Sequence, residues 1–203
     1  MIDRRIKRSK KILKDTFIRL LNEKSFDMIT IKELVAEADV NRSTFYDHYE
    51  NKEHLLIEIM ETILEEMERA LLLPVKNGET NINFEDKDPS VVTVLKYVDY
   101  NKFYLQALIN SNLADDFNKR LYDLLIKHSR ENIEFHFKNN VQINKHIYSH
   151  YAMSSLLGII NAWLKNEITC TLEELSEEIY KINTYTPYKV STKKTLSTME
   201  EPL

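Results

Sequence analysis

Residues 30–56 read TIKELVAEADVNRSTFYDHYENKEHLL and contain two short amphipathic segments. The first segment begins with Thr30 and Glu33, which form the T-x-x-E pattern of a capping box, so a helix is expected over 31–38. Asn41 follows a brief interruption and can cap a second helix, because its side-chain oxygen can accept from backbone N–H groups one turn on. The stretch therefore predicts two short helices joined by a tight turn.

The second helix is expected over 42–48, with Phe45 and Tyr49 on its buried side. A longer helix over 9–24 precedes the pair, and another over 52–73 follows it. Two short helices set at a steep angle by a three-residue turn, with a third helix to support them, have the geometry of a helix-turn-helix. In that arrangement the second helix can enter the major groove of DNA.

Polar side chains occupy the outward positions of the second helix, which are Arg42, Ser43, Thr44, Asp47 and His48. Arg42 can donate to guanine O6 and N7, whereas Thr44 and Tyr46 suit phosphate or a thymine methyl group. Thr30 and Lys52 stand at two further helix N-termini, where free N–H groups and the helix dipole favour phosphate. Short amphipathic helix pairs also occur in plain helical bundles, so this geometry alone leaves both interpretations open.

These residues resemble the DNA-binding module of TetR/AcrR-type transcriptional regulators. Residues 44–55 match the family pattern T-[LF]-Y-x-[HY]-[FY]-x-[SN]-K-x-x-L at every fixed position, and the resemblance covers about residues 8–56. Two positions depart from the family. Asp39 stands where the turn usually has glycine, although Asp tolerates a left-handed backbone better than most residues. Asp47 places a carboxylate on the groove-facing side, where it repels phosphate but can accept from cytosine N4.

The resemblance implies an all-α fold, in which a three-helix DNA-binding head is joined by a long helix to a helical bundle that dimerises and binds a ligand. The implied domains are a head over 1–51, a regulatory and dimerisation domain over 52–183 and a flexible tail over 184–203. Family positions that commonly touch phosphate include that of Tyr49, whose ring alternatively serves only the core. The side chains expected to contact DNA are Thr30, Lys32, Arg42, Ser43, Thr44, Tyr46, Asp47, His48, Tyr49 and Lys52.

Glycine is scarce in this chain, with 2 among 203 residues, and there are 4 prolines. Hairpin turns and glycine-rich nucleotide-binding loops need such residues, so the composition favours an all-helical protein over a Rossmann or P-loop enzyme. Cys170 is the single cysteine, which excludes an internal disulfide and a multi-thiolate metal site. No apolar run reaches the roughly 18 residues of a membrane span, and no apolar stretch follows the basic N-terminus. We therefore expect a cytoplasmic protein with no membrane partner.

The net charge of −4 is unevenly distributed along the chain. Residues 1–14 hold seven Lys or Arg and one acidic residue, whereas residues 57–203 hold 16 basic and 22 acidic residues. A basic end on an acidic body is expected where that end meets a polyanion such as DNA. The alternative is a basic arm that only aids solubility.

Helical periodicity resumes after a polar loop over 74–89. Thr171 and Glu174 form a second capping box, which opens a final helix. The helices expected in this part of the chain are 90–99, 102–109, 113–137, 145–167 and 172–182.

The helix over 145–167 has two apolar stripes, one of them with small residues toward its C-terminal end. Small residues let helix backbones approach closely, as at a two-fold interface, so two copies of this helix and the last one can form a four-helix bundle. This arrangement is similar to the dimer of the family. The alternative is that both stripes pack inside one monomer. The residues expected at the interface are Tyr151, Ser155, Gly158, Ala162, Leu175 and Ile179.

Residues 103–127 are rich in aromatic and aliphatic side chains, which can line an apolar ligand cavity or form plain core. The side chains expected to line a pocket are Phe103, Tyr104, Phe117, Leu121 and Tyr122. This segment and residues 158–165 also loosely resemble a family subset associated with dihydroxyacetone-kinase regulators. In that subset a protein coregulator, rather than a free small ligand, can be the partner.

His146 and His150 have the i, i+4 spacing that can chelate one metal ion, but no third ligand is evident. The chain has no nucleophile elbow, no H-E-x-x-H motif and no paired-carboxylate motif in a catalytic context. We therefore expect no metal, no cofactor and no enzymatic activity.

Together these features predict a dimeric TetR-type repressor that binds a palindromic double-stranded DNA operator and is released by a small-molecule or protein effector. A coregulator that acts through a protein partner, with weak or no operator binding, is the first alternative, favoured by Asp47. A helical enzyme or metal protein is the second alternative.

Overall fold

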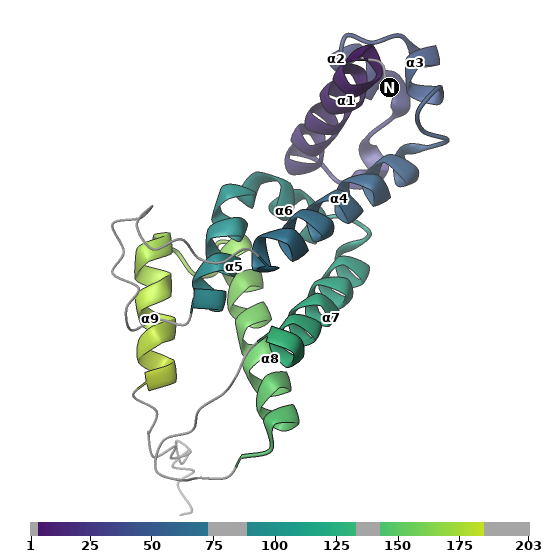
Figure 1. The fold of residues 1–203 in the computed structure, drawn as a ribbon. Coiled ribbons are helices and arrows are strands. Elements are labelled where there is room, and N and C mark those ends of the chain that lie inside the picture. Colours follow the sequence, from purple (N-terminus) through teal and green to yellow (C-terminus); the bar gives the residue numbers. More distant parts are fainter. Residues whose placement is uncertain (1–3, 73–88, 133–142, 185–203) are drawn as a thin grey trace, which may run out of the picture.

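The computed structural model describes residues 4–72, 89–132 and 143–184, and every regular element within these ranges is a helix (Figure 1). This confirms the predicted all-α fold. The first elements are α1 (Arg4–Glu23), the 3-10 helix η1 (Phe26–Met28), α2 (Ile31–Glu37), α3 (Arg42–Tyr46) and α4 (Lys52–Leu72). The later elements are α5 (Pro89–Tyr100), α6 (Lys102–Ile109), α7 (Ala114–Asn132), α8 (Lys145–Leu164) and α9 (Leu172–Thr184). We call α1 to α3 the head and α4 to α9 the body.

Several helix boundaries differ from the prediction, among them those of α1, α3 and α8. α1 begins at Arg4 rather than at residue 9, because Lys and Arg are good helix formers even where no apolar stripe marks the helix. α3 ends at Tyr46, two residues early. α8 ends at Leu164 rather than 167, because Asn166 turns the backbone into the left-handed region with a φ of 58°.

Several expectations lie wholly or mainly outside the described residues. They are the loop over 74–89, the end of the helix expected to reach residue 137, and the tail over 184–203.

The predicted caps are present at both ends of the chain. Thr30 Oγ1 accepts from the Glu33 N–H at 3.2 Å, and Asn41 Oδ1 accepts from the Ser43 N–H at 3.3 Å. Thr171 and Glu174 form a reciprocal capping box, with N–H to side-chain distances of 2.8 and 3.2 Å. Each cap satisfies N–H groups that the first helical turn leaves unpaired, which fixes where the helix starts.

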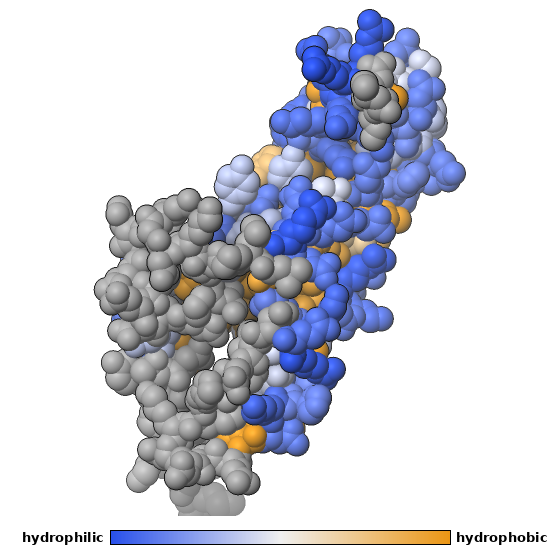
Figure 2. Space-filling view, viewed as in Figure 1, coloured by the Kyte–Doolittle hydropathy of each residue, from blue (hydrophilic) through white to orange (hydrophobic). Residues whose placement is uncertain are grey.

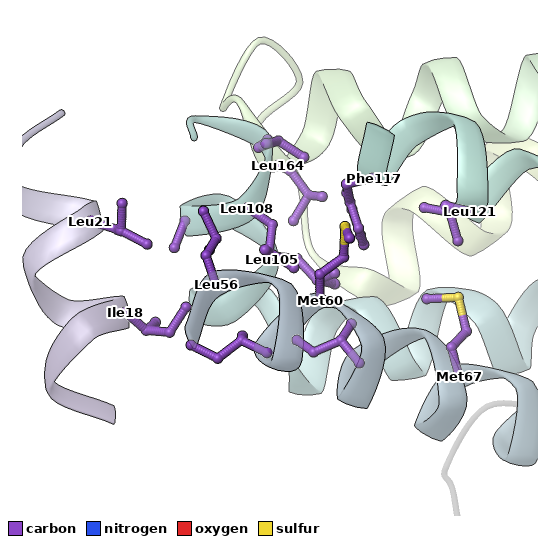
Figure 3. Close-up of a cluster of buried hydrophobic side chains, with 14 of the residues drawn as sticks. Ile18, Leu21, Leu56, Met60, Met67, Leu105, Leu108, Phe117, Leu121 and Leu164 are labelled. Carbon is purple, nitrogen blue, oxygen red and sulfur yellow. The ribbon is translucent and has the colours of Figure 1, made fainter. Parts of the chain in front are cut away.

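The hydrophobic core runs without a break from the head into the body. Ile18 and Leu21 on α1 point toward Leu56 on α4, and the cluster continues to Phe117 on α7 and Leu164 on α8 (Figure 3). All five side chains are at most 5% exposed. The head is therefore held to α4 and α6 by apolar packing as well as by the covalent connection.

In the body, α7 and α8 lie side by side, whereas α9 stands apart from α8 and packs on α5 (Figure 1). Trp163 on α8 is 2% exposed, and its Nε1–H donates to the Cys170 carbonyl at 3.1 Å. The Lys102 ammonium lies 4.8 Å from the centroid of the Trp163 ring, within cation–π range. Among the described helices, none is both long and apolar enough to cross a membrane.

The turn between α2 and α3 depends on a left-handed residue. Asp39 has a φ of 51°, and the next N–H, that of Val40, donates to the Val35 carbonyl at 3.0 Å. This conformation is unfavourable for residues with a Cβ atom, but the short polar side chain of Asp reduces the cost. Asp39 therefore adopts the left-handed backbone that the usual glycine would adopt at this position of the turn.

We expect Asp39→Ala to lower the free energy of unfolding by about 1 kcal/mol, because alanine lacks the local polar compensation of Asp in the left-handed region. Urea unfolding followed by circular dichroism measures the change. The matched control is Asp47→Ala, since Asp47 is also exposed but has a right-handed backbone with a φ of −67°. Equal effects of the two substitutions would contradict the strain assigned to Asp39.

Candidate nucleic-acid interface

The short helix α3 presents a polar face that the core holds from behind. Phe45 is fully buried, whereas the Tyr46 side chain is 47% exposed. The guanidinium of Arg42 lies 5.6 Å from the centroid of the Tyr46 ring, and its Nη2 donates to the Tyr46 hydroxyl at 3.4 Å. Ser43 is exposed as well, so the structure brings three of the predicted contact residues together on one face.

The remaining predicted residues on and beside α3 differ in how far their side chains are exposed. Asp47 is exposed and Thr44 is half-buried. His48 is also half-buried, and its Nε2 lies 2.9 Å from Ser9 Oγ, which ties the end of α3 to α1. Lys32 is exposed on α2, in the first turn of that helix.

Tyr49 requires a correction, because the structure places it in the core of the head. Its side chain is 1% exposed, its ring packs against Phe45 at 5.7 Å between centroids, and its hydroxyl donates to Glu58 at 3.5 Å. Burial and the neighbouring Glu58 carboxylate raise the pKa of Tyr49. A side chain so enclosed cannot reach phosphate, so we remove Tyr49 from the residues expected to contact DNA.

Lys52 is also used within the fold. Its Nζ donates to the carbonyls of Phe26 and Ile29 at 2.8 and 3.0 Å, and lies 4.2 Å from the centroid of the Phe26 ring. The ammonium therefore fastens the start of α4 to the connection between α1 and α2. Because the ammonium already donates to two carbonyls, a contact with phosphate would compete with these hydrogen bonds. The positive end of the α4 dipole remains available to bind phosphate.

The N-terminal end of α1 adds a basic surface to the same end of the molecule as α2 and α3 (Figure 1). Arg4, Arg5, Lys7 and Arg8 are all exposed there, and this end is strongly hydrophilic in Figure 2. From the sequence, this basic end was predicted to meet a polyanion such as DNA, but its place relative to the second helix of the pair was not predicted. Their position beside α3 makes them part of the candidate interface, because exposed Arg and Lys contribute the salt-dependent share of DNA binding.

One carboxylate joins α1 to α4 directly behind this surface. Glu58 accepts from Lys10 at 2.9 Å and lies 2.9 Å from the Lys14 ammonium. Burial opposes ionisation of this carboxyl, but the hydrogen bonds from the two lysines outweigh that cost and hold the pKa of Glu58 below its usual value. The pairs are part-exposed, so we assign them an orienting role rather than a large share of stability.

The five residues expected to line a ligand pocket do not converge. Phe117 and Leu121 are at most 1% exposed within the core, whereas Phe103 is 50% exposed. The Tyr104 hydroxyl donates to Asp15 on α1, and the Tyr122 hydroxyl lies 2.6 Å from His150 Nδ1. These side chains belong to different surroundings because the segment spans two helices and the turn between them.

The residues expected at a dimer interface fall into two groups. On α8, Ser155 and Gly158 are exposed and Tyr151 is 59% exposed. On α9, Leu175 and Ile179 are 4% and 7% exposed, because this helix buries them within its own chain against α5. The two α9 residues are therefore corrected to monomer core. Ala162 is half-buried near the end of the α8 stripe.

The histidine pair on α8 does not form a metal site in the described part of the chain. No group of three His, Cys, Asp or Glu side chains is placed to hold an ion among those residues. His150 instead lies between two side chains of α7, with Arg130 Nη2 at 3.0 Å from its Nε2.

Two family models match the chain, one toward each end. Residues 15–59 match the model described as bacterial regulatory proteins, tetR family, and residues 85–185 match the one described as a transcriptional regulator C-terminal region. The chain belongs to the TetR family of transcriptional regulators.

Individual relatives support the same assignment at low identity. The chain is 25% identical over 196 residues to the uncharacterized HTH-type transcriptional regulator YxbF of Bacillus subtilis strain 168, covering 93% of this chain and 48% of YxbF. It therefore spans about half the length of that relative. It is 22% identical over 136 residues to the HTH-type dhaKLM operon transcriptional activator DhaS of Lactococcus lactis subsp. lactis IL1403, covering 64% and 67% of the two chains.

Solved structures share the fold. A TetR transcriptional regulator from Streptococcus agalactiae 2603V is 28% identical with a TM-score of 0.57, covering 89% of this chain and 96% of the other. The dihydroxyacetone kinase operon activator DhaS is 20% identical with a TM-score of 0.56, covering 86% and 93%. The latter similarity shows the fold alone.

We expect Lys52→Met to lower the free energy of unfolding by about 2 kcal/mol, because two hydrogen bonds from a charged donor are lost while the aliphatic stem is kept. Urea unfolding measures the loss. Lys32→Met is the matched control, since it removes a lysine that is exposed on the neighbouring helix. A loss no greater than that of the control would contradict the fastening role of Lys52.

Proposed function

We propose that this chain binds a palindromic double-stranded DNA operator as a homodimer and represses transcription until an effector releases it. The head, residues 1–51, would contact DNA, and residues 52–183 would carry dimerisation and regulation. The observation that carries the proposal is the exposed face of Arg42, Ser43 and Tyr46 on a short helix that stands beside a basic helix end. Such a face combines side chains that read base edges with charges that attract phosphate.

Within this proposal the exposed residues have separate tasks. Arg42, at the first position of α3, would donate to guanine, and Tyr46 would contact phosphate at the other end of the helix. Thr44 and His48 are half-buried, so they would reach DNA only at the edge of the interface. Thr30 and Lys32 would bind phosphate at the N-terminal end of α2, where the helix dipole is positive.

Regulation would follow from the connection between head and body. α4 runs from the head through the body and contacts α5 and α7, so a change in the body can move the head (Figure 1). Two recognition helices bind best when they lie about 34–36 Å apart, one turn of DNA. An effector that favours a different spacing would lower the affinity of the protein for the operator, because the two binding equilibria are thermodynamically linked.

A coregulator that acts mainly through a protein partner is the alternative supported by a specific observation. Asp47 is exposed directly after α3 and would face the phosphates of a bound duplex, where a carboxylate is unfavourable. The relative DhaS is named as a transcriptional activator of an operon, so regulation other than repression also occurs among similar proteins.

Fluorescence anisotropy against duplexes tiled from around the chain's own gene, measured across a salt series, tests the proposal. We expect tight, salt-sensitive binding to one palindromic tile.

Arg42→Ala should weaken that binding by about 1–3 kcal/mol per half-site and reduce sequence selectivity, because a bidentate base contact is lost. Lys32→Ala should weaken all tiles equally and reduce the salt slope by about one unit per phosphate contact.

Lys119→Ala on α7 is the control, since it removes an exposed lysine remote from α3 and should change neither quantity. Weak binding that is equal on every tile, with no effect of Arg42→Ala, would contradict the repressor and favour the coregulator.

The proposed dimer rests on the exposed face of α8. Ile147 and Tyr151 are 68% and 59% exposed, and Ser155 and Gly158 continue the same side of the helix. Large exposed apolar side chains beside small residues are typical of a helix that packs against a second helix. A two-fold pair of α8 helices would bury both of the large side chains.

Gly158→Arg tests the dimer without disturbing the monomer, because a Cβ atom at Gly158 meets no atom within 4 Å. We expect wild-type protein to sediment as a dimer and the variant as a folded monomer, since a long charged side chain would enter the interface from both subunits. Asn112→Arg adds the same charge at an exposed turn and should stay dimeric. A dimeric Gly158→Arg variant would place the interface elsewhere.

A further inference from the structure

We propose that a groove between the head and the body binds a small organic anion that carries a planar ring. The groove has a volume of about 560 Å³ and lies between α1, α4 and the corner where α5 meets α6. This volume is within the range of cavities that hold small ligands, about 300–1,000 Å³. None of the residues that line the groove belongs to α3, and no DNA is needed to test the proposal.

One wall of the groove is basic. Lys7, Lys10, Lys11 and Lys14 line it from one face of α1, with the i, i+3, i+4, i+7 spacing of helix neighbours. Lys10 and Lys14 are held by Glu58. Lys7 and Lys11 are exposed, and within the described ranges neither makes an ion pair. Two ammonium groups one turn apart are therefore available to a single anion.

The wall formed by the end of α5 presents an uncovered aromatic ring. Tyr100, the last residue of α5, lines the groove and is 90% exposed. Asn101 and Tyr104 extend this wall, and Ile59 and Ile63 form an apolar part of the floor. A tyrosine ring offers an apolar face on which a second flat ring stacks favourably. The pairing of ammonium groups with this ring selects a ligand that has both a charge and a planar part.

The acidic groups that line the groove are already engaged by protein partners. Asp15 accepts from the Tyr104 hydroxyl, and Glu58 is paired with two lysines. Glu66 accepts from the Tyr97 hydroxyl at 3.4 Å. These carboxylates reduce the positive field, so the groove suits a ligand with one or two negative charges in preference to a highly charged polyanion.

A ligand in this place would touch the head and the body at once. Lys7 and Lys11 belong to α1 of the head, whereas Tyr100 ends a helix of the body. A molecule that contacts both sides stabilises the head–body arrangement in which both contacts are made.

Two fluorescent probes that share one ring system test the site in the absence of DNA. 8-Anilinonaphthalene-1-sulfonate carries the anion, and N-phenyl-1-naphthylamine is the same ring system without it. We expect Lys7→Gln/Lys11→Gln to weaken binding of the sulfonate about tenfold or more, because its charge-assisted hydrogen bonds are lost. Binding of the neutral probe should change less than about twofold, since that probe has no anionic group to accept these hydrogen bonds. Tyr100→Ala should weaken both probes.

Lys119→Gln/Lys165→Gln is the matched control, because it removes two exposed lysines from α7 and the end of α8. Circular dichroism confirms that each variant is folded. Equal affinity of the sulfonate for the groove variant and the control would overturn the proposal. A tenfold loss with the lysine variant but none with Tyr100→Ala would also overturn it, because the lysines would then bind anions without the groove.

Discussion

The apolar contact between α1 and α4 is the constraint on which the rest of this molecule depends. Ile18 and Leu21 pack toward Leu56, so the last turns of the first helix are buried at the junction of head and body. Without this contact, the head would be joined to the body only through polar contacts, such as those of Glu58 with Lys10 and Lys14, and through the chain itself. With it, a displacement of α4 moves α1, and α1 carries both the basic end and the support for α3.

Local signals predicted much of the fold because they need only residues close in sequence. The capping boxes at Thr30 and Thr171 depend on a partner three residues on, and both formed. The exposed positions of α3 followed from helical periodicity. The start of α1 at Arg4 was missed because periodicity detects buried faces, and the first turns of that helix bury none.

The errors at Leu175, Ile179 and Tyr49 share one physical cause, which is that a pattern shows an apolar face but not the surface that covers it. Leu175 and Ile179 have the spacing of an interface, yet α9 buries them against α5 of the same chain. Tyr49 fits a family position for phosphate, yet its ring fills the core of the head. Lys52 bonds carbonyls 23 and 26 residues away, a contact that no local pattern encodes.

The single tryptophan gives this chain a natural optical reporter. Trp163 is buried at the junction of α8 with the residues around Cys170, and a cation from α6 lies over its ring. Indole emission depends on the polarity and charge around the ring, so its wavelength reports on the separation of α6 and α8. Because no other residue emits as indole does, this emission follows the body without an added label.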